Sequence, residues 1–278
     1  MTPPRLAGID LGSNTVRLLV VEVGDAGGWR VVDQDQRVTR LGEGLASSGR
    51  LGEAPMARTT VAIAEYVARA ARAGARETRI IATSAVREAA NGGDFVAALE
   101  RATGARVDVV SGEDEARLTV RGIAAGLGRA AGSMLAFDIG GGSTEFTLAR
   151  DGRVAAAVSL GLGVVPLAER YPFPGPVEGP RYRALEREVR ERLAAELPPA
   201  IRRSGLADLV GTAGTVTTLA ALDLGLAAYD AARVQGHRLA RAAVVRLRDR
   251  LGALTVRERG DLPCLEPGRA DLIVPGVA

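Results

Sequence analysis

Hydrophobic and polar residues alternate along the chain in blocks that predict strands and helices in turn. Strand patterns occupy residues 5–10, 16–23, 29–38, 78–83 and 107–110, and helical spacing occupies 54–75, 84–104 and 111–127. The second half shows strands within 135–150, 153–160 and 207–211, a loop at 171–180, and helices at 180–203 and 240–251. Alternating strands and helices predict an α/β fold.

One pattern occurs twice. "GIDLGSNTVRLLV" and "AFDIGGGSTEFTL" share an apolar residue, an aspartate, Leu or Ile, a glycine, a small polar turn, a threonine and a strand. Asp10 and Asp138 occupy the same place in the two copies. An internal repeat of a whole strand–turn–strand unit predicts two like-folded halves that face each other.

The glycine turns between the paired strands suit phosphate. A turn without side chains exposes consecutive backbone N–H groups, which bind anionic oxygens. Short polar side chains add donors at the same places. The predicted phosphate-binding residues of the two turns are Gly12, Ser13, Asn14, Gly140, Gly141, Gly142, Ser143 and Thr144. An aspartate this close to a phosphate needs a counterion, so Asp10 and Asp138 are predicted to hold Mg²⁺, with Mn²⁺ as the alternative.

Composition excludes several other classes of function. The 278 residues are 47% hydrophobic and 25% charged, which predicts a folded chain with a core. All 36 basic residues are arginine, which excludes a P-loop and Schiff-base chemistry. The single cysteine, Cys264, excludes an internal disulfide and a cysteine zinc site. Aromatic residues are only 3%, which argues against nucleic-acid binding. No segment predicts a membrane span, and the expected location is the cytoplasm.

Six motifs together resemble one protein family. They are "GIDLGSNTVRLLV", "ATSAVREA", "VVSGEDEARLTVRGI", "FDIGGGSTEF", "GTAGTVTTLAA" and "LEPGRADLIVPG". In this order they are similar to the exopolyphosphatase/guanosine pentaphosphate phosphatase family, part of the actin, Hsp70 and sugar-kinase superfamily. The resemblance implies two ribonuclease-H-like (actin-like ATPase) domains across an interdomain cleft, 1–126 and 127–278. It also implies a hydrolase acting on phosphoric anhydrides.

The resemblance also implies roles for individual residues. Glu115, in "SGEDEA", matches the glutamate that positions or activates the attacking water. Asp138 matches a metal-associated aspartate, and Glu145 matches a second carboxylate beside the water and the metal. Arg17, Arg87 and Arg269 lie within matched motifs, and Arg87 is the arginine predicted to bind phosphate. Gly214 and Thr215 complete the predicted phosphate-binding residues.

The expected reaction releases terminal phosphate from polyphosphate, guanosine pentaphosphate or both. Two alternatives stay open: a non-catalytic sensor of polyphosphate or guanosine tetraphosphate, and an ATP-dependent small-molecule kinase of the same superfamily. Family members usually continue past "RADLIVPG", so the sequence predicts a second domain that is truncated at its C-terminal end. A homodimer is the expected assembly.

Overall fold

The computed structural model describes residues 3–24, 28–127, 132–205 and 208–278. The chain forms two compact units, Met1–Ser111 and Gly112–Ala278. Each unit is built on its own β-sheet. No helix in the described ranges is both long enough and apolar enough to cross a membrane.

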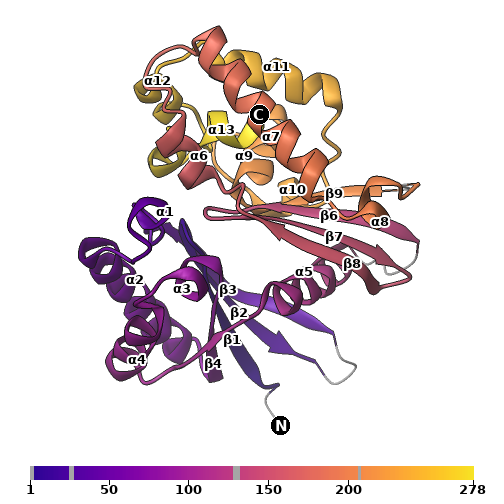
Figure 1. The fold of residues 1–278 in the computed structure, drawn as a ribbon. Coiled ribbons are helices and arrows are strands. Elements are labelled where there is room, and N and C mark those ends of the chain that lie inside the picture. Colours follow the sequence, from indigo (N-terminus) through magenta and orange to yellow (C-terminus); the bar gives the residue numbers. More distant parts are fainter. Residues whose placement is uncertain (1–2, 25–27, 128–131, 206–207) are drawn as a thin grey trace. The chain divides into compact units, whose positions relative to one another are not determined.

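The first unit holds a five-stranded sheet covered on one face by helices (Figure 1). Its strand order is β3-β2-β1-β4-β5, with β1, β2 and β3 antiparallel and β4 and β5 parallel to β1. The elements are β1 (Arg5–Leu11), β2 (Thr15–Val23), β3 (Trp29–Val38), α1 (Leu45–Ser48), α2 (Glu53–Arg72), β4 (Ala75–Ala82), α3 (Ser84–Glu88), α4 (Gly92–Thr103) and β5 (Arg106–Val109).

Alternation along the strands builds the core of this unit. Ile9 on β1 and Leu18 on β2 are buried, and they pack in one cluster with Ile63 and Tyr66 of α2. Successive strand residues point to opposite faces, so one face collects the apolar side chains under α2 and α4. The sequence predicts this layer correctly, except that the helical pattern 84–104 divides into α3 and α4.

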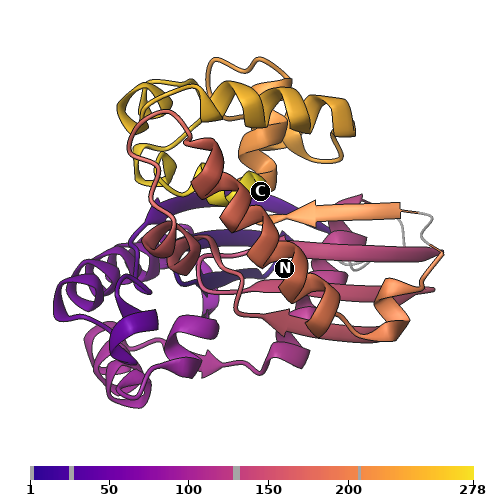
Figure 2. The same cartoon turned by 45° about the horizontal axis from the view of Figure 1, so that its top comes forward.

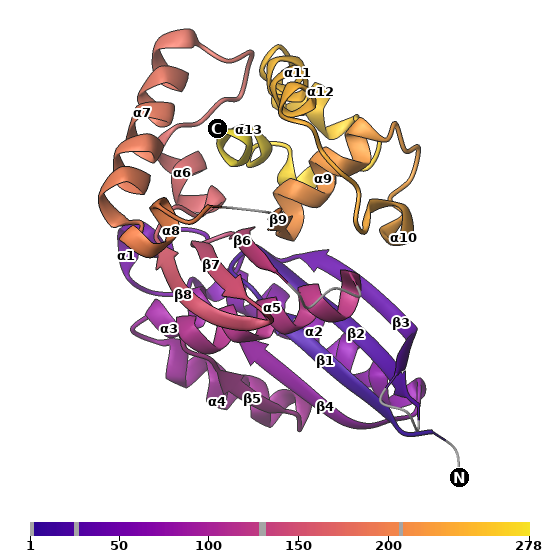
Figure 3. The ribbon, with the colours of Figure 1, turned by 90° about the vertical axis from the view of Figure 1, so that its right-hand side faces the viewer.

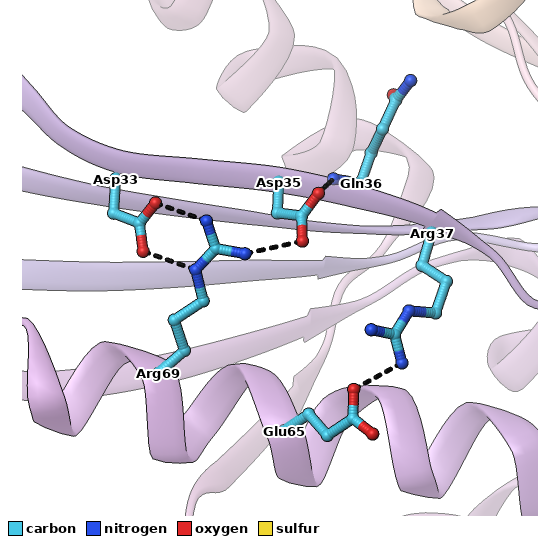
Figure 4. A network of polar contacts seen from close by, with 6 residues as sticks. All are labelled: Asp33, Asp35, Gln36, Arg37, Glu65 and Arg69. Atoms are coloured by element: carbon cyan, nitrogen blue, oxygen red, sulfur yellow. Dashed lines mark hydrogen bonds and ion pairs between the residues drawn. The ribbon is translucent and has the colours of Figure 1, made fainter.

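An arginine fork fastens α2 to strand β3 (Figure 4). Arg69 donates through Nε and Nη2 to Asp33 at 2.6 and 2.7 Å, and through Nη1 to Asp35 at 2.7 Å. The hydrogen bond from Arg69 lowers the pKa of Asp33. One turn earlier, Glu65 pairs with Arg37 of β3 at 2.6 Å. Paired planar contacts of this kind hold geometry better than isolated surface ion pairs do.

The second unit holds a four-stranded sheet and most of the helices. Its elements are α5 (Gly112–Leu127), β6 (Ser133–Ile139), β7 (Thr144–Arg150), β8 (Arg153–Leu160), α6 (Val164–Arg170), α7 (Gly179–Glu196), α8 (Pro199–Arg202), β9 (Asp208–Thr212), α9 (Ala213–Asp223), α10 (Ala231–Val234), α11 (Arg241–Gly252), α12 (Val256–Gly260), a short 3₁₀ turn (Pro267–Arg269) and α13 (Ile273–Val277).

The second sheet repeats the topology of the first. Its order is β8-β7-β6-β9, with an antiparallel β6–β7–β8 meander and β9 parallel to β6 (Figure 2). The same arrangement relates β3, β2, β1 and β4. The register matches as well: Asp10 opposes Arg17 in the first hairpin, and Asp138 opposes Glu145 in the second. The repeat seen in the sequence is therefore a repeat of fold.

Helix α5 belongs to the second compact unit. Its buried residues Ala116, Val120 and Ile123 recur every three to four positions and form one apolar stripe. The helix packs against β7 and β8. The division into domains 1–126 and 127–278 stays a prediction, while the compact units divide before this helix rather than near its end.

The remaining helices gather over the second sheet. α13 lies against α6, α9 and α11 (Figure 3). The pattern that predicts one helix over 180–203 gives two, α7 and α8, because Pro198 and Pro199 interrupt the helical hydrogen bonds. The predicted strand 207–211 starts at a residue outside the described ranges, and β9 covers Asp208–Thr212.

A buried arginine ties the loop before α7 to α11 and α12. Arg259 has no exposed surface and donates to four backbone oxygens: Leu251 and Phe173 at 2.8 Å, Gly175 at 3.1 Å and Leu254 at 2.7 Å. Burial lowers the pKa of its guanidinium. Because no other side chain offers five donors in a planar fork, this junction needs arginine.

Replacing Arg259 with leucine should lower the free energy of unfolding by more than about 3 kcal/mol, since several buried carbonyls lose their donor. Denaturant unfolding measures this change. Arg257→Met, at an exposed position of the same helix, is the matched control and should change stability by less than about 0.5 kcal/mol. Equal effects of the two substitutions would contradict the structural role given to the hydrogen bonds of Arg259.

Candidate active site in the second unit

Backbone hydrogen bonds fix the second glycine turn from both sides. The turn joins β6 to β7, and Gly140 N donates to Ser143 O at 2.9 Å. At the start of α6, Val164 N donates to Gly140 O at 3.0 Å. The turn is therefore held in one shape by its own backbone and by the helix that follows β8.

Gly163, directly before α6, approaches this turn so closely that no side chain fits. A Cβ atom on Gly163 would collide with the carbonyl carbon of Gly142 and the oxygen of Gly141. The missing side chain of Gly163 thus lets the chain before α6 pack directly on the backbone of the turn.

Two carboxylates reach this turn from the flanking strands. Asp138 and Glu145 are direct partners across β6 and β7. A Cβ atom on Gly140 would lie 3.8 Å from Asp138 Oδ1 and 3.9 Å from Glu145 Oε2. Both side chains therefore lie at the turn that is predicted to hold phosphate.

Glu145 is buried, with 5% of its surface exposed, and its charge is disfavoured. Burial is the largest cause that raises its pKa, to about 7, followed by repulsion from Glu115 and, more weakly, from Asp138. Hydrogen bonds from Ser143 and Ser159 oppose the shift. Three predicted site carboxylates are thus close enough to interact.

Glu115 comes to this cluster from the first turn of α5. A Cβ atom on Gly112, at the start of that helix, would lie 3.7 Å from Ser159 Cβ on β8. The neighbouring acid Glu113 instead lies outside: its side chain is 68% exposed and pairs with Arg117 at 2.6 Å. The helix start therefore separates one inward glutamate from an ordinary surface one.

Two hydroxyl groups that the sequence analysis missed contact the carboxylates. Ser159 Oγ donates to Glu145 Oε1 at 2.7 Å, and Thr212 Oγ1 donates to Asp138 Oδ2 at 2.8 Å. A serine among the apolar residues of "RVAAAVSL" is the one signal that could have indicated the first. Thr144, by contrast, gives its hydroxyl proton to Leu162 O at 2.8 Å, so that proton is not available to a phosphate.

The first glycine turn lies in the other compact unit and is also held by backbone bonds. Gly12 N donates to Thr15 O at 3.1 Å, and Asn14 O accepts from Thr39 N at 2.9 Å. Ser13 Oγ lies 2.9 Å from Ser84 Oγ, and both residues are buried.

Charged groups near the first turn are paired within their own unit. Arg17 Nη1 donates to Asp10 Oδ2 at 3.1 Å, so this predicted metal ligand has a cationic neighbour across the hairpin. Arg87, on α3, donates to Val110 O at 2.9 Å. The metal role of Asp10 and the phosphate role of Arg87 stay predictions.

Gly214 and Thr215 lie at the start of α9, beneath Arg269. A Cβ atom on Gly214 would collide with the guanidinium of Arg269, whose Nε donates to Glu266 at 2.8 Å. Ala213, between β9 and this glycine, has φ 66°, a conformation that costs a non-glycine residue energy. Local strain here accompanies close packing of an arginine on the backbone.

The second unit thus brings together Glu115, Asp138, Glu145 and the turn 140–143. Among the described residues, no three His, Cys, Asp or Glu side chains already converge as a metal site. Oxygen ligands still suit Mg²⁺, which usually takes one or two carboxylates and completes its shell with water and phosphate. The donor set around Asp138 fits that mode of binding.

Comparison with known proteins identifies the relatives of the chain. The family model for the Ppx/GppA phosphatase family matches residues 19–278. Exopolyphosphatase 2 of Mycobacterium tuberculosis is 36% identical over 287 residues, covering 99% of this chain and 88% of the relative. The chain belongs to the Ppx/GppA phosphatase family.

Solved structures agree with this Ppx/GppA assignment. The Ppx/GppA family member of Aquifex aeolicus superposes with a TM-score of 0.80 at 28% identity, covering 99% of this chain and 87% of its own. An exopolyphosphatase from Cytophaga hutchinsonii gives 0.87 at 25% identity, covering 98% and 88%. The resemblance, the two-domain α/β fold class and the expectation of a hydrolase are confirmed; the interdomain cleft stays a prediction.

The raised pKa of Glu145 predicts that this residue destabilises the folded Ppx/GppA phosphatase as the pH rises. The folded-state pKa of about 7 lies above the ordinary 4.5, so the contribution of Glu145 to stability is greatest below pH 4.5 and is lost as pH rises through 7. Glu145→Gln keeps the shape without the charge. In metal-free buffer its gain in unfolding free energy over wild type should be about 2 to 3 kcal/mol larger at pH 8 than at pH 5.

Denaturant unfolding at the two pH values measures that difference. Glu113→Gln, an exposed acid outside the cluster, should stay within about 0.5 kcal/mol of wild type at both pH values. If Glu145→Gln changed stability equally at pH 5 and pH 8, Glu145 would not be buried as a disfavoured charge.

Proposed function

We propose that this chain is a metal-assisted phosphohydrolase that releases terminal phosphate from inorganic polyphosphate, guanosine pentaphosphate or both. The observation that carries the proposal is the convergence of Asp138 and Glu145 on the turn at Gly140, with Glu115 close enough to raise the pKa of Glu145. A backbone turn that accepts an anion, beside carboxylates that can orient water, suits hydrolysis of a phosphoric anhydride.

Attack of water on a terminal phosphoryl group needs mainly that the water and the phosphate are held in position. The turn 140–143 would hold the terminal phosphoryl group by its backbone N–H groups. Glu115 would orient the attacking water, whose oxygen forms the new bond to phosphorus as the bridging P–O bond breaks. A carboxylate of the cluster takes the proton that the water releases, and Glu145, with a pKa near 7, is suited to hold it at neutral pH.

Asp138 would hold the divalent cation, with Asp10 of the first unit as the second predicted ligand. Mg²⁺, or Mn²⁺ as the alternative, would neutralise charge on the phosphate oxygens when bound. The acidic surroundings of Glu145 support a cation here, because a nearby positive charge would relieve the repulsion among the three carboxylates.

The relatives favour polyphosphate as substrate. Exopolyphosphatase 2 and Exopolyphosphatase 1 of M. tuberculosis are 36% and 32% identical to this chain. Guanosine pentaphosphate stays within the proposal because the family resemblance implies either substrate, or both. The cytoplasmic location and the homodimer stay predictions.

Phosphate release from short-chain polyphosphate and from guanosine pentaphosphate, with and without Mg²⁺, tests the proposal. The wild-type chain should release phosphate only with the metal. Glu115→Gln and Glu145→Gln should each lower kcat at least about 100-fold, since a positioned acid–base group contributes about 10² to 10⁴. Glu113→Gln is the matched control and should stay within about twofold.

Other outcomes select the alternatives. Tight binding of polyphosphate or guanosine tetraphosphate without turnover would replace the enzyme with a sensor. Phosphate transfer from ATP to a sugar would replace the hydrolase with a kinase. Release of phosphate that is unchanged in Glu115→Gln would contradict the role given to that residue.

A further inference from the structure

Four side chains form one row across the second sheet, at the end next to the glycine turn. Ser159 of β8 is paired in register with Glu145 of β7, Glu145 with Asp138 of β6, and Asp138 with Thr212 of β9. The row is therefore hydroxyl, carboxylate, carboxylate, hydroxyl. Each hydroxyl donates to the carboxylate beside it, at 2.7 Å from Ser159 and 2.8 Å from Thr212.

The two hydroxyls contact the outer oxygen of each acid. Ser159 holds Glu145 Oε1 and Thr212 holds Asp138 Oδ2. The other two oxygens, Glu145 Oε2 and Asp138 Oδ1, are the ones within 4 Å of a Cβ position on Gly140. A carboxylate fixed at one oxygen has its second oxygen fixed too, because the group is planar and rigid. The flanking bonds therefore direct both acids toward the turn.

Thr212 stands at the start of a helix. It is the N-cap residue of α9, where a threonine hydroxyl commonly accepts from the backbone N–H of the next turn. Here the Thr212 side chain makes no capping bond. Its proton goes to Asp138 at 2.8 Å, with a longer approach of 3.3 Å to Phe137 O.

The first sheet shows that the hydroxyls are not a requirement of the fold. The equivalent row there is Gln36, Arg17, Asp10 and Ile81. Ile81 takes the place of Thr212 and cannot donate, and Asp10 is held by Arg17 at 3.1 Å instead. In the second sheet, where Glu145 rather than an arginine faces the aspartate across the hairpin, a hydroxyl flanks each of the two acids.

We propose that Ser159 and Thr212 are positioning residues that aim Glu145 and Asp138 at the phosphate-binding turn. This inference rests on the proposed function, because it assigns the two hydroxyls to the same reaction. Neither hydroxyl touches the reacting atoms; each acts through the carboxylate that it holds. Partners of this kind typically contribute about 10- to 100-fold to activity.

Steady-state kinetics of phosphate release from short-chain polyphosphate with Mg²⁺ tests the proposal. Ser159→Ala and Thr212→Val should each lower kcat about 10- to 100-fold and change KM by less than about threefold. Thr212→Ser and Ser159→Thr keep a hydroxyl and should retain kcat within about threefold of wild type. Ser133→Ala, which removes a hydroxyl at the far end of β6, is the control and should leave both constants unchanged.

Thr212→Val with kcat within twofold of wild type would overturn the proposal for that residue. So would a Thr212→Ser variant as impaired as Thr212→Val, which would assign the effect to packing rather than to the hydroxyl. The same two criteria apply to the Ser159 variants. If a variant at one of the two positions fails to fold, the variants at the other position still test the proposal.

A crystal structure of each variant separates this inference from the proposed function. The carboxylate of Asp138 should rotate away from Gly140 in Thr212→Val, and that of Glu145 in Ser159→Ala. A wild-type chain without phosphate release would contradict the proposed function, whereas carboxylates that keep their orientation in the variants would contradict the positioning role.

Discussion

The buried carboxylate of Glu145 is the constraint around which the candidate site of the second unit is built. Glu145 is 5% exposed, and its pKa of about 7 shows that burial and two neighbouring acids oppose its ionisation. Such a residue persists only where its surroundings hold it in place. The surroundings here are a serine on the next strand, a glycine turn braced by the start of α6, and the first turn of α5.

The internal repeat shows how one scaffold supports two kinds of site. Both hairpins place an aspartate before a glycine turn and a charged residue opposite it in register. In the first half that residue is Arg17, which pairs with Asp10 at 3.1 Å. In the second half it is Glu145, which repels Asp138. The strand pairing is the same, and the residue opposite the aspartate decides whether the hairpin holds an ion pair or two acids.

The sequence predicts the repeated hairpins and the alternation of strands with helices, because both leave a local signal. The roles of the acids come from the resemblance to the family. The glycine turns, the aspartates and "SGEDEA" can all be recognised from adjacent residues. Contacts set by register across strands leave no such signal. Ser159 and Thr212 are 53 residues apart, and they meet the acids only because β8 pairs with β7 and β9 pairs with β6. Pro198 and Pro199 indicate a break between α7 and α8, but the helical spacing on both sides of them predicts one continuous helix. Assignment of α5 depends on which sheet its apolar stripe covers, which periodicity cannot reveal.

Two helices of the second unit begin beside the acidic residues. Both α5, through Glu115, and α9, through Thr212 directly before it, present an N-terminus to the acidic row. An N-terminus carries partial positive charge, which favours nearby carboxylates and phosphate alike. This field lowers the electrostatic cost of gathering three acids in one place. A helix N-terminus favours nearby carboxylates and leaves them able to hold a cation. The two helix starts therefore offset part of the repulsion that Glu115 and Asp138 exert on Glu145.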